Sequence, residues 1–311
     1  MDKNTEYVGK VCLHYDYYSG EDLYQDGSED ELLDIVKNHS QNEYNGIIEE
    51  RKSWPILYHL SDIRGNIVDW IPFTKEDSVL EIGAGCGAIT GTLSRHAGKV
   101  DCIELSKKRS LVNAERHKEY DNIDITVGNF QDIEKNIEKK YDYITLIGVL
   151  EYAASYINSD EPYEEFLNII KAHLKPEGKI IVAIENKYGL KYWAGCREDH
   201  LSTYFTGIEG YVGVDSVKTF SKNGLIRLFN NSGLNDISFY YPYPDYKLPL
   251  TIYSDDYLPA PGSLNNNFRN FDNDRMLIFD ESKVFDNLIM DGMFDIFSNS
   301  FLVMAGKEVQ A

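Results

Sequence analysis

The chain has 311 residues, enough to bury a hydrophobic core without disulfide support, as one large domain or two small ones. Its 51 Asp and Glu residues outnumber 31 Lys and Arg residues, and the resulting net charge of -20 would repel a phosphate backbone. This charge argues against DNA or RNA as the substrate, so we expect no nucleic-acid partner.

The four cysteines form neither a C-x-x-C pair nor a spacing typical of zinc ligands; they are Cys12, Cys86, Cys102 and Cys196. This pattern is typical of a reduced intracellular protein. The opening residues lack the basic-then-apolar layout of a signal peptide, and no apolar run approaches the roughly 20 residues that cross a bilayer. We therefore expect a cytoplasmic protein without a transmembrane segment.

The first part of the chain divides into a turn-rich arm and a helical region. Residues 1–27 are rich in Tyr and Asp, which fits an ordered arm over a pocket or a flexible leader. Residues 28–71 repeat apolar positions at helical spacing and predict two or three helices. We take residues 1–72 as an arm and helical cap, and residues 73–311 as the main domain.

Short apolar runs then alternate with helical stretches. Five runs begin at residues 78, 99, 123, 141 and 178, and this alternation predicts a parallel sheet covered by helices. Two more runs, DISFYYPY at 236 and SFLVMAGK at 300, bring the predicted sheet to seven strands. The long segment before the last strand, about 245–298, is typical of a lid or insertion.

The first of these strands leads into the glycine-rich stretch VLEIGAGCGAITG, residues 79–91, which has two interpretations. Read as G-x-G-x-x-G/A, Gly83, Gly85 and Ala88 fit a dinucleotide site. Read as E-x-G-x-G-x-G, Glu81 with Gly83, Gly85 and Gly87 fits a loop that binds S-adenosylmethionine.

Charge favours the second interpretation. A pyrophosphate needs backbone N–H groups at a helix start, and the Glu81 carboxylate would oppose it, whereas S-adenosylmethionine carries a cationic sulfonium and ammonium. Glu104 ends the next strand, where a carboxylate can accept bonds from both ribose hydroxyls. The one Y-x-x-x-K pattern, Tyr243 to Lys247, contains Pro244 and cannot be helical, which argues against an NAD-dependent dehydrogenase.

Five motifs in chain order resemble those of class I S-adenosylmethionine-dependent methyltransferases: VLEIGAGCGAIT, CIEL, VGNFQDI, YDYITLIGVLEY and HLKPEGKIIVAIEN, within residues 75–188. The resemblance implies an α/β fold with a Rossmann-like, doubly wound, seven-stranded, mostly parallel sheet and an antiparallel last strand. It also implies transfer of a methyl group from S-adenosylmethionine, with S-adenosylhomocysteine as product.

Cofactor contacts follow from this resemblance: Glu81 and the glycines at the methionine end, Glu104 at the ribose, and Asn129 with Phe130 at the adenine. The full set implied is Glu81, Gly83, Ala84, Gly85, Gly87, Glu104, Leu105, Asn129, Phe130, Gly148 and Glu151, the last two behind the sulfonium. Asn129 stands where the family often has Asp. The plainer alternatives are a tight turn at the glycines and a core position for Phe130.

Methyl transfer depends mainly on alignment, but an alcohol acceptor also benefits from a general base. We look for that base in ENKYGLKYWAGCREDHLSTYFTG, which follows the fifth predicted strand. His200 is the candidate, with Asp199 or Glu198 to orient it and Glu185 nearby; a solvated charge cluster is the alternative. Polar and aromatic side chains suited to a polyol complete the predicted site: Asn186, Tyr188, Tyr192, Trp193, Arg197, Asp245 and Tyr246.

Weaker motifs across the chain, such as EDH and YPYPDYKLP, resemble methyltransferases of bacterial surface-polysaccharide synthesis. The sequence thus predicts an O-methyltransferase that acts on a hydroxyl of a saccharide, nucleotide-sugar or glycan. Two alternatives stay open: a small-molecule N-methyltransferase, and a non-catalytic cofactor-binding scaffold for a glycosyltransferase. A glycosyltransferase partner and a homodimer also stay open. We predict no metal, although Glu185, Asp199, His200 and Asp245 could supply hard ligands.

Overall fold

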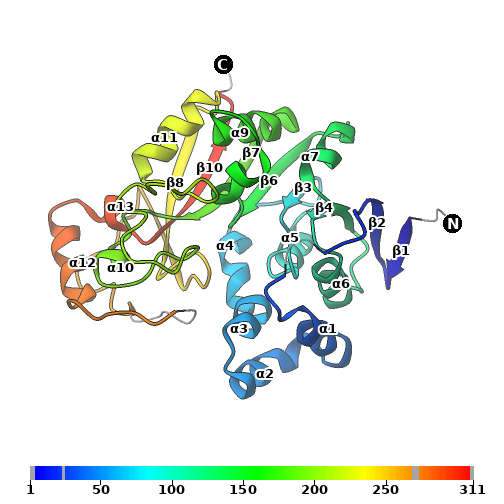
Figure 1. The fold of residues 1–311 in the computed structure, drawn as a ribbon, viewed down its shortest axis with the longest axis horizontal. Coiled ribbons are helices and arrows are strands. Elements are labelled where there is room, and N and C mark those ends of the chain that lie inside the picture. Colours follow the sequence, from blue (N-terminus) through cyan, green and yellow to red (C-terminus); the bar gives the residue numbers. More distant parts are fainter. Residues whose placement is uncertain (1–3, 23–24, 268–272, 309–311) are drawn as a thin grey trace. The chain divides into compact units, whose positions relative to one another are not determined.

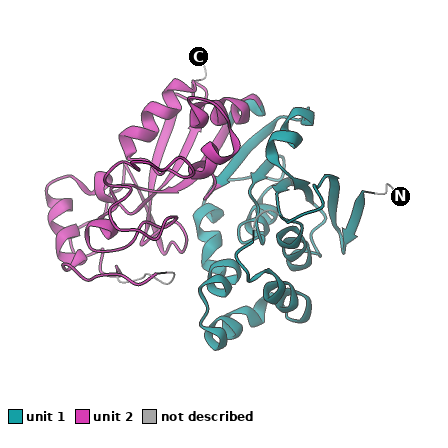
Figure 2. Ribbon diagram, in the orientation of Figure 1, with its two compact units in different colours: residues 1–146, 173–178 teal, residues 147–172, 179–311 magenta. Residues whose placement is uncertain are grey.

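The structure is a computed structural model, and it describes residues 4–22, 25–267 and 273–308. The chain forms two compact units, one of residues 1–146 with 173–178 and the other of residues 147–172 with 179–311 (Figure 2). The glycine-rich loop belongs to the first unit, and the predicted acceptor residues belong to the second.

The first unit is built on a mostly parallel sheet (Figure 1). Its strands are β1 (Thr5–Val8), β2 (Val11–Tyr17), β3 (Ser78–Ile82), β4 (Lys99–Glu104), β5 (Ile123–Gly128) and β6 (Tyr141–Ile147), in the order β1-β2-β5-β4-β3-β6. Only β1 and β2 pair antiparallel; the other pairs are parallel. Every residue of β3 is buried, as expected for a parallel strand covered on both faces.

Helices of the first unit form the cap and cover the sheet. The cap contains α1 (Glu29–Asn38), α2 (Tyr44–Arg51), α3 (Trp54–Leu60) and the single turn α4 (Asn66–Asp69), where the sequence predicts two or three helices. The helices α5 (Thr90–His96), α6 (Lys107–Arg116) and α7 (Phe130–Ile133) follow the strands. Apolar cap residues such as Leu32 and Ile56 share one core cluster with Cys86 of the glycine-rich loop and Val112 of α6, so the cap packs against this loop.

The second unit contains an antiparallel arrangement of strands. Residues 179–185 of β7 (Leu174–Glu185) pair with β10 (Ser300–Gly306), which pairs with β8 (Asp236–Tyr243), which pairs with β9 (Thr251–Ser254). The helices are α8 (Ala153–Tyr156), α9 (Pro162–Ala172), α10 (Leu190–Trp193), α11 (Lys222–Asn231), α12 (Glu281–Met290) and α13 (Phe294–Phe297). Edge-to-face packing of Phe239 on Phe301, with ring centroids 5.6 Å apart, lies in its core.

All seven predicted strands form, and the last strand is antiparallel to both of its neighbours, as expected. The predicted total of seven is wrong, because the described residues contain ten strands. β1 and β2 come from the arm, where apolar residues of β2 extend the sheet beside β5, and β9 pairs with the edge of β8. The physical reason is that an open sheet edge accepts a further strand wherever a neighbouring segment can supply hydrogen bonds.

Two predictions about organisation remain predictions. The division at residues 72 and 73 is one of them. The insertion at about 245–298 is the other; it contains β9, α12 and α13, and its residues 268–272 lie outside the described part of the chain. Across the described residues, none of the helices has the length and apolar character needed to cross a membrane.

Candidate functional site

The glycine-rich loop joins β3 to α5, and its three glycines have left-handed backbones, with φ of 72° at Gly83, 55° at Gly85 and 76° at Gly87. A Cβ atom on Gly87 would lie 2.3 Å from the Asn113 Oδ1 atom of α6. A Cβ atom on Gly85 would lie 4.0 Å from the Gly83 carbonyl oxygen, with no closer contact among the described residues. Gly87 thus lets the loop pack on α6, whereas Gly85 leaves the backbone accessible.

Glu104 at the end of β4 contacts this loop. Its Oε2 atom accepts a hydrogen bond of 2.8 Å from Gly85 N–H, and its Oε1 atom accepts one of 2.9 Å from Ser106 N–H. Burial raises the pKa of Glu104, although these backbone bonds act in the opposite direction. The predicted ribose ligand is therefore next to the loop, with Leu105 directly after it, and its contact with a ribose stays a prediction.

Glu81 is directed toward α5 and β4. Thr90 Oγ1 donates a 2.6 Å hydrogen bond to Glu81 Oε2, and Cys102 Sγ lies 3.5 Å from the same oxygen. Burial raises the pKa of Glu81 to about 7. A contact with the methionine end of the cofactor stays a prediction, and it would have to use the oxygen that Thr90 leaves available.

Three other predicted cofactor residues have local roles. Asn129 Oδ1 accepts a hydrogen bond of 3.1 Å from Gln131 N–H and caps α7, so a bond from an adenine amino group would share this oxygen. Phe130, the first residue of α7, is half-buried. Ala84 is buried, and its N–H donates to the carbonyl of Ile103.

Gly148 and Glu151 follow β6 and belong to the second unit. A Cβ atom on Gly148, whose φ is 71°, would lie 3.0 Å from Tyr246 Oη and 3.6 Å from Glu151 Oε1. These two predicted cofactor residues therefore lie beside a residue predicted for the acceptor.

A buried group of acids surrounds His200; we call Glu151, Glu185, Glu198 and His200 the Glu–His cluster. His200 Nδ1 is 3.0 Å from Glu198 Oε1, while His200 Nε2 is 3.5 Å from Glu151 Oε1 and 3.8 Å from Glu185 Oε2. Glu151 lies in the turn after β6, Glu185 is the last residue of β7, and the other two follow α10. The chain thus gathers at strand ends residues that are far apart in the sequence.

The acids control the charge on His200. Burial acts to lower the pKa of His200, but the carboxylates of Glu185, Glu151 and Glu198 raise it to about 11. His200 is therefore an imidazolium at neutral pH. Its predicted role as a general base requires a neutral ring, so that role would need a compensating change in the local charge.

The sequence predicts that Asp199 or Glu198 orients His200, and in the structure Glu198 is the one that contacts the His200 ring. Glu198 Oε2 accepts hydrogen bonds from the backbone N–H groups of His200 and Leu201, at 2.8 and 2.7 Å, and Tyr211 Oη donates to Oε1 at 3.0 Å. These bonds fix the carboxylate that contacts His200 Nδ1.

Asp199 belongs instead to a second group, the Lys–Asp cluster of Lys191, Lys247, Asp199 and Asp245. The Asp199 carboxylate accepts bonds from Lys247 Nζ at 2.5 Å, Tyr192 Oη at 2.5 Å and Lys191 Nζ at 3.0 Å. Although burial opposes ionisation, the two lysines hold the pKa of Asp199 well below its usual range. Lys191 also contacts Asp245 at 2.8 Å, and Lys247 contacts Glu185 Oε1 at 2.5 Å, which links the two clusters.

Neither lysine was predicted as a site residue, because no short-range pattern connects residue 247 with residues 185 and 199. Among the predicted acceptor residues, Tyr192 and Asp245 take part in the Lys–Asp cluster, and Tyr246 lies near Gly148.

The other predicted acceptor residues make different contacts. Asn186 Nδ2 donates to the carbonyls of Ile296 and Ser298 at 2.7 and 2.8 Å, so its amide holds the end of β7 in place. The Arg197 guanidinium lies 4.3 Å from the Tyr204 ring centroid. Trp193 is 41% exposed, and its Nε1 donates to the carbonyl of the half-buried Tyr188. An acceptor contact by any of these residues stays a prediction.

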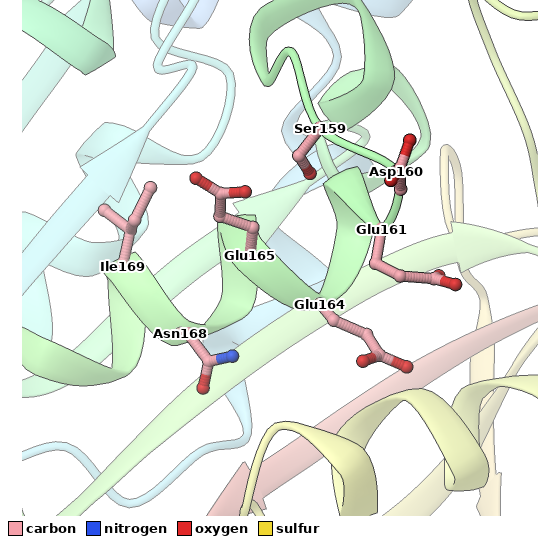
Figure 3. Close-up of a pocket in the computed structure, with 7 residues that line it drawn as sticks. All are labelled: Ser159, Asp160, Glu161, Glu164, Glu165, Asn168 and Ile169. Carbon is pink, nitrogen blue, oxygen red and sulfur yellow. The ribbon is translucent and has the colours of Figure 1, made fainter.

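An open surface pocket of about 600 Å³ lies at the start of α9 (Figure 3). It contains none of the predicted site residues and is lined by Ser159, Asp160, Glu161, Glu164, Glu165, Asn168 and Ile169. Its acidic side chains make it a source of control positions for experiments on the Glu–His cluster.

Residues 80–180 match the family model of a methyltransferase domain. The chain therefore contains a methyltransferase domain. For this domain the predicted enzyme class and the predicted cofactor, S-adenosylmethionine, are confirmed, and the dinucleotide interpretation of the glycines is set aside.

Curated relatives match only part of the chain. The ribosomal RNA small subunit methyltransferase A of Leuconostoc mesenteroides is 37% identical over 84 residues, which are 27% of this chain and 28% of that protein. The protein of the same name from Staphylococcus aureus is 26% identical over 126 residues, 39% of this chain and 40% of that protein. The chain thus spans well under half the length of these relatives.

Solved structures are similar at low identity. A SAM-dependent methyltransferase from Archaeoglobus fulgidus has a TM-score of 0.49 and 14% identity, covering 85% of this chain and 100% of that chain. The phosphoethanolamine N-methyltransferase 1 of Haemonchus contortus has a TM-score of 0.46 and 14% identity, covering 87% of this chain and 50% of that chain. Neither similarity bears on what this chain acts on.

Proposed function

We propose that the chain transfers the methyl group of S-adenosylmethionine to a hydroxyl of a saccharide, nucleotide-sugar or glycan. The observation that carries this proposal is the buried Glu–His cluster, joined to the Lys–Asp cluster through the contact of Lys247 with Glu185. Together these clusters offer charged hydrogen-bond donors and acceptors beside the Tyr192 ring, a combination suited to polyols.

A hydroxyl acceptor explains the acids better than an amine acceptor does. A neutral amine attacks the methyl group without first losing a proton, whereas a hydroxyl benefits from a group that takes its proton in the transition state. The three carboxylates around the His200 imidazole strongly favour a positive charge at this place, carried either by a proton or by a bound cation. The N-methyltransferase alternative could use this arrangement to bind an ammonium group, but it needs no group that takes a proton from a hydroxyl.

We propose Glu185, Asp199 and His200 as the catalytic residues, as the sequence predicts, but with different partners from those expected. Glu198 orients His200, Lys247 links Glu185 to Asp199, and His200 Nε2 is directed toward Glu151 and Glu185. His200 can accept a proton from a hydroxyl only when its own ring is neutral. Because the neighbouring carboxylates favour the protonated ring, the proposal requires their negative charge to be reduced or compensated when the acceptor binds.

The names of the relatives raise ribosomal RNA as another acceptor. The net charge of -20 opposes it, because RNA binding normally relies on Lys and Arg contacts to phosphate. The scaffold alternative predicts binding of S-adenosylmethionine without methyl transfer. The link to polysaccharide synthesis, a glycosyltransferase partner and a cytoplasmic location remain expectations from the sequence.

The test is methyl transfer from S-adenosylmethionine with a deuterated methyl group to four acceptor pools: nucleotide-sugars, oligosaccharides, small amines and ribosomal RNA. We expect mass spectrometry to find the label on a sugar oxygen. Glu185→Gln should lower the rate about 100-fold or more, and Glu164→Gln in the surface pocket should not change it. Label on an amine or on RNA would replace the proposed acceptor class, and cofactor binding with no labelled product would support the scaffold.

A further inference from the structure

Two carboxylate oxygens of the Glu–His cluster have no hydrogen-bond partner among the residues that the structure describes. Glu151 Oε2 and Glu185 Oε2 are fully buried, on residues that are 1% and 0% exposed. A buried acceptor without a partner costs free energy, and an ionised one costs more. Two such oxygens in one cluster indicate a binding position for a positively charged group.

The spacing around His200 fits metal ligands better than hydrogen bonds. The distances of 3.5 and 3.8 Å from His200 Nε2 to Glu151 Oε1 and Glu185 Oε2 exceed the normal N–H···O range. One ligand atom from each of these three residues lies within 4.8 Å of the other two. Atoms bound to one ion at about 2.0–2.2 Å lie roughly 3 to 3.5 Å apart, so a modest contraction would form a coordination shell.

Neighbouring side chains already hold these ligands in place. Glu198 contacts the Nδ1 atom of His200, which leaves Nε2 directed toward the two acids. Lys247 binds the Oε1 atom of Glu185 and leaves Oε2 for the site. Metal-binding histidines usually have such a carboxylate on the second ring nitrogen, and metal-binding carboxylates usually have a second hydrogen-bond partner.

The charge of the two clusters also favours a cation. Two ammonium groups, those of Lys191 and Lys247, face five carboxylates, which belong to Glu151, Glu185, Glu198, Asp199 and Asp245. The excess is three negative charges before His200 is counted. Burying unbalanced charge is costly, and a divalent cation would remove most of this excess.

We propose that Glu151, Glu185 and His200 Nε2 bind one divalent cation through two carboxylates and a neutral imidazole, so that binding of the cation releases the Nε2 proton of His200 to solvent. This mixed set of ligands suits a first-row ion such as Mn²⁺. Cation binding does not depend on the proposed function. The cation's use does: acceptor hydroxyls would complete the coordination shell, and His200 would then be a ligand instead of the base.

A second trio, Cys12, His14 and Asp124, has similar spacing but does not support the same inference. Asp124 already forms an ion pair of 2.6 Å with Lys99. Burial raises the pKa of the Cys12 thiol, which disfavours the thiolate that a metal needs.

The experiment is titration of the full chain with MnCl₂, in the absence of acceptor, followed by calorimetry and electron paramagnetic resonance. We expect one bound Mn²⁺ per chain and a nitrogen coupling in the pulsed spectrum from the His200 ring. Glu151→Gln, Glu185→Gln and His200→Gln should each weaken binding at least tenfold, and His200→Gln should also abolish the nitrogen coupling.

Glu164→Gln is the matched control, because it makes the same chemical change at the acidic surface pocket. A cooperative urea unfolding transition in each variant shows that it is folded. Absence of Mn²⁺ binding by the native chain, or equal binding by all variants, would overturn the cation site. If a variant does not fold, loss of the nitrogen coupling in the conservative His200→Asn variant decides the matter. Mn²⁺ binding with no methyl transfer to any sugar would instead reject the proposed function.

Discussion

Glu81 makes the stability of the chain depend on pH, because its carboxyl group is buried beside Thr90 and Cys102. Its pKa rises from the usual 4.5 to about 7 in the folded chain. Between these values the folded state holds a proton that the unfolded state has lost. The contribution of Glu81 is therefore most favourable below pH 4.5, falls as pH rises toward 7 and is constant above that.

We expect Glu81→Gln to remove this fall. The amide keeps an oxygen that can accept the Thr90 hydrogen bond, and it does not ionise. Above pH 7 the variant should be more stable than the native chain by up to about 3 kcal/mol. Urea unfolding at several pH values between 4.5 and 8 measures the difference, with Glu164→Gln as the control. Parallel profiles for Glu81→Gln and the native chain would show that Glu81 ionises normally.

At the site, residue types were predictable from the sequence, but partners were not. Glu185, Asp199 and His200 were singled out because acids and a histidine follow a predicted strand, and they do lie close together. The assignment of partners depends on tertiary structure: the Asp199 carboxylate binds Lys247, whereas Glu198 contacts His200. Glu151, predicted behind the sulfonium, also contacts His200, which no local pattern indicates.

At the scale of elements, the glycine-rich loop shows how a single motif combines packing with access. Gly85 and Gly87 have similar left-handed backbones, yet only Gly87 lies against the Asn113 side chain. Asn113 is itself fixed, because its Nδ2 atom donates to Thr90 Oγ1 at 3.0 Å. A methyl group at residue 87 therefore has no space unless α6 moves.

This difference predicts different main effects for two alanine variants. Each should lose about 1–2 kcal/mol of stability from the left-handed backbone, and Gly87→Ala should lose a further 1–3 kcal/mol from the contact with Asn113. Gly85→Ala should mainly weaken binding of S-adenosylmethionine, because the new methyl group enters the accessible side of the loop. Urea unfolding and calorimetry measure the two effects. Equal losses of stability in both variants would contradict the assigned division of roles.

The strands differ in how far the sequence predicts them. The buried strands β3 to β8 and β10 contain apolar runs that suffice to locate them. β1 and β2 were not predicted, because the arm is rich in Tyr and charged residues and its extended form depends on pairing with β5. In the described part of the arm, Val11 and Leu13 of β2 are fully buried, so this part forms an ordered strand; that the arm covers a pocket stays a prediction.

At the scale of the whole molecule, charge distinguishes the proposed acceptor from the one that the relatives' names suggest. The matched relatives are ribosomal RNA methyltransferases, yet the match covers 27% of this chain in one and 39% in another. The 51 acidic and 31 basic residues are counted over the whole chain, so the negative net charge describes this protein and not only the stretch that matches the relatives.

We therefore expect no measurable binding of a ribosomal RNA fragment between about 50 and 200 mM salt, because few cations are available to replace the counterions of the phosphates. Fluorescence anisotropy with a labelled fragment tests this, and the same titration with labelled S-adenosylhomocysteine shows that the protein is active in binding. If RNA binds with an affinity that falls linearly with salt on logarithmic axes, a basic surface outweighs the net charge. The acceptor would then have to be sought among nucleic acids, while the cation site at Glu151, Glu185 and His200 would still be testable by Mn²⁺ alone.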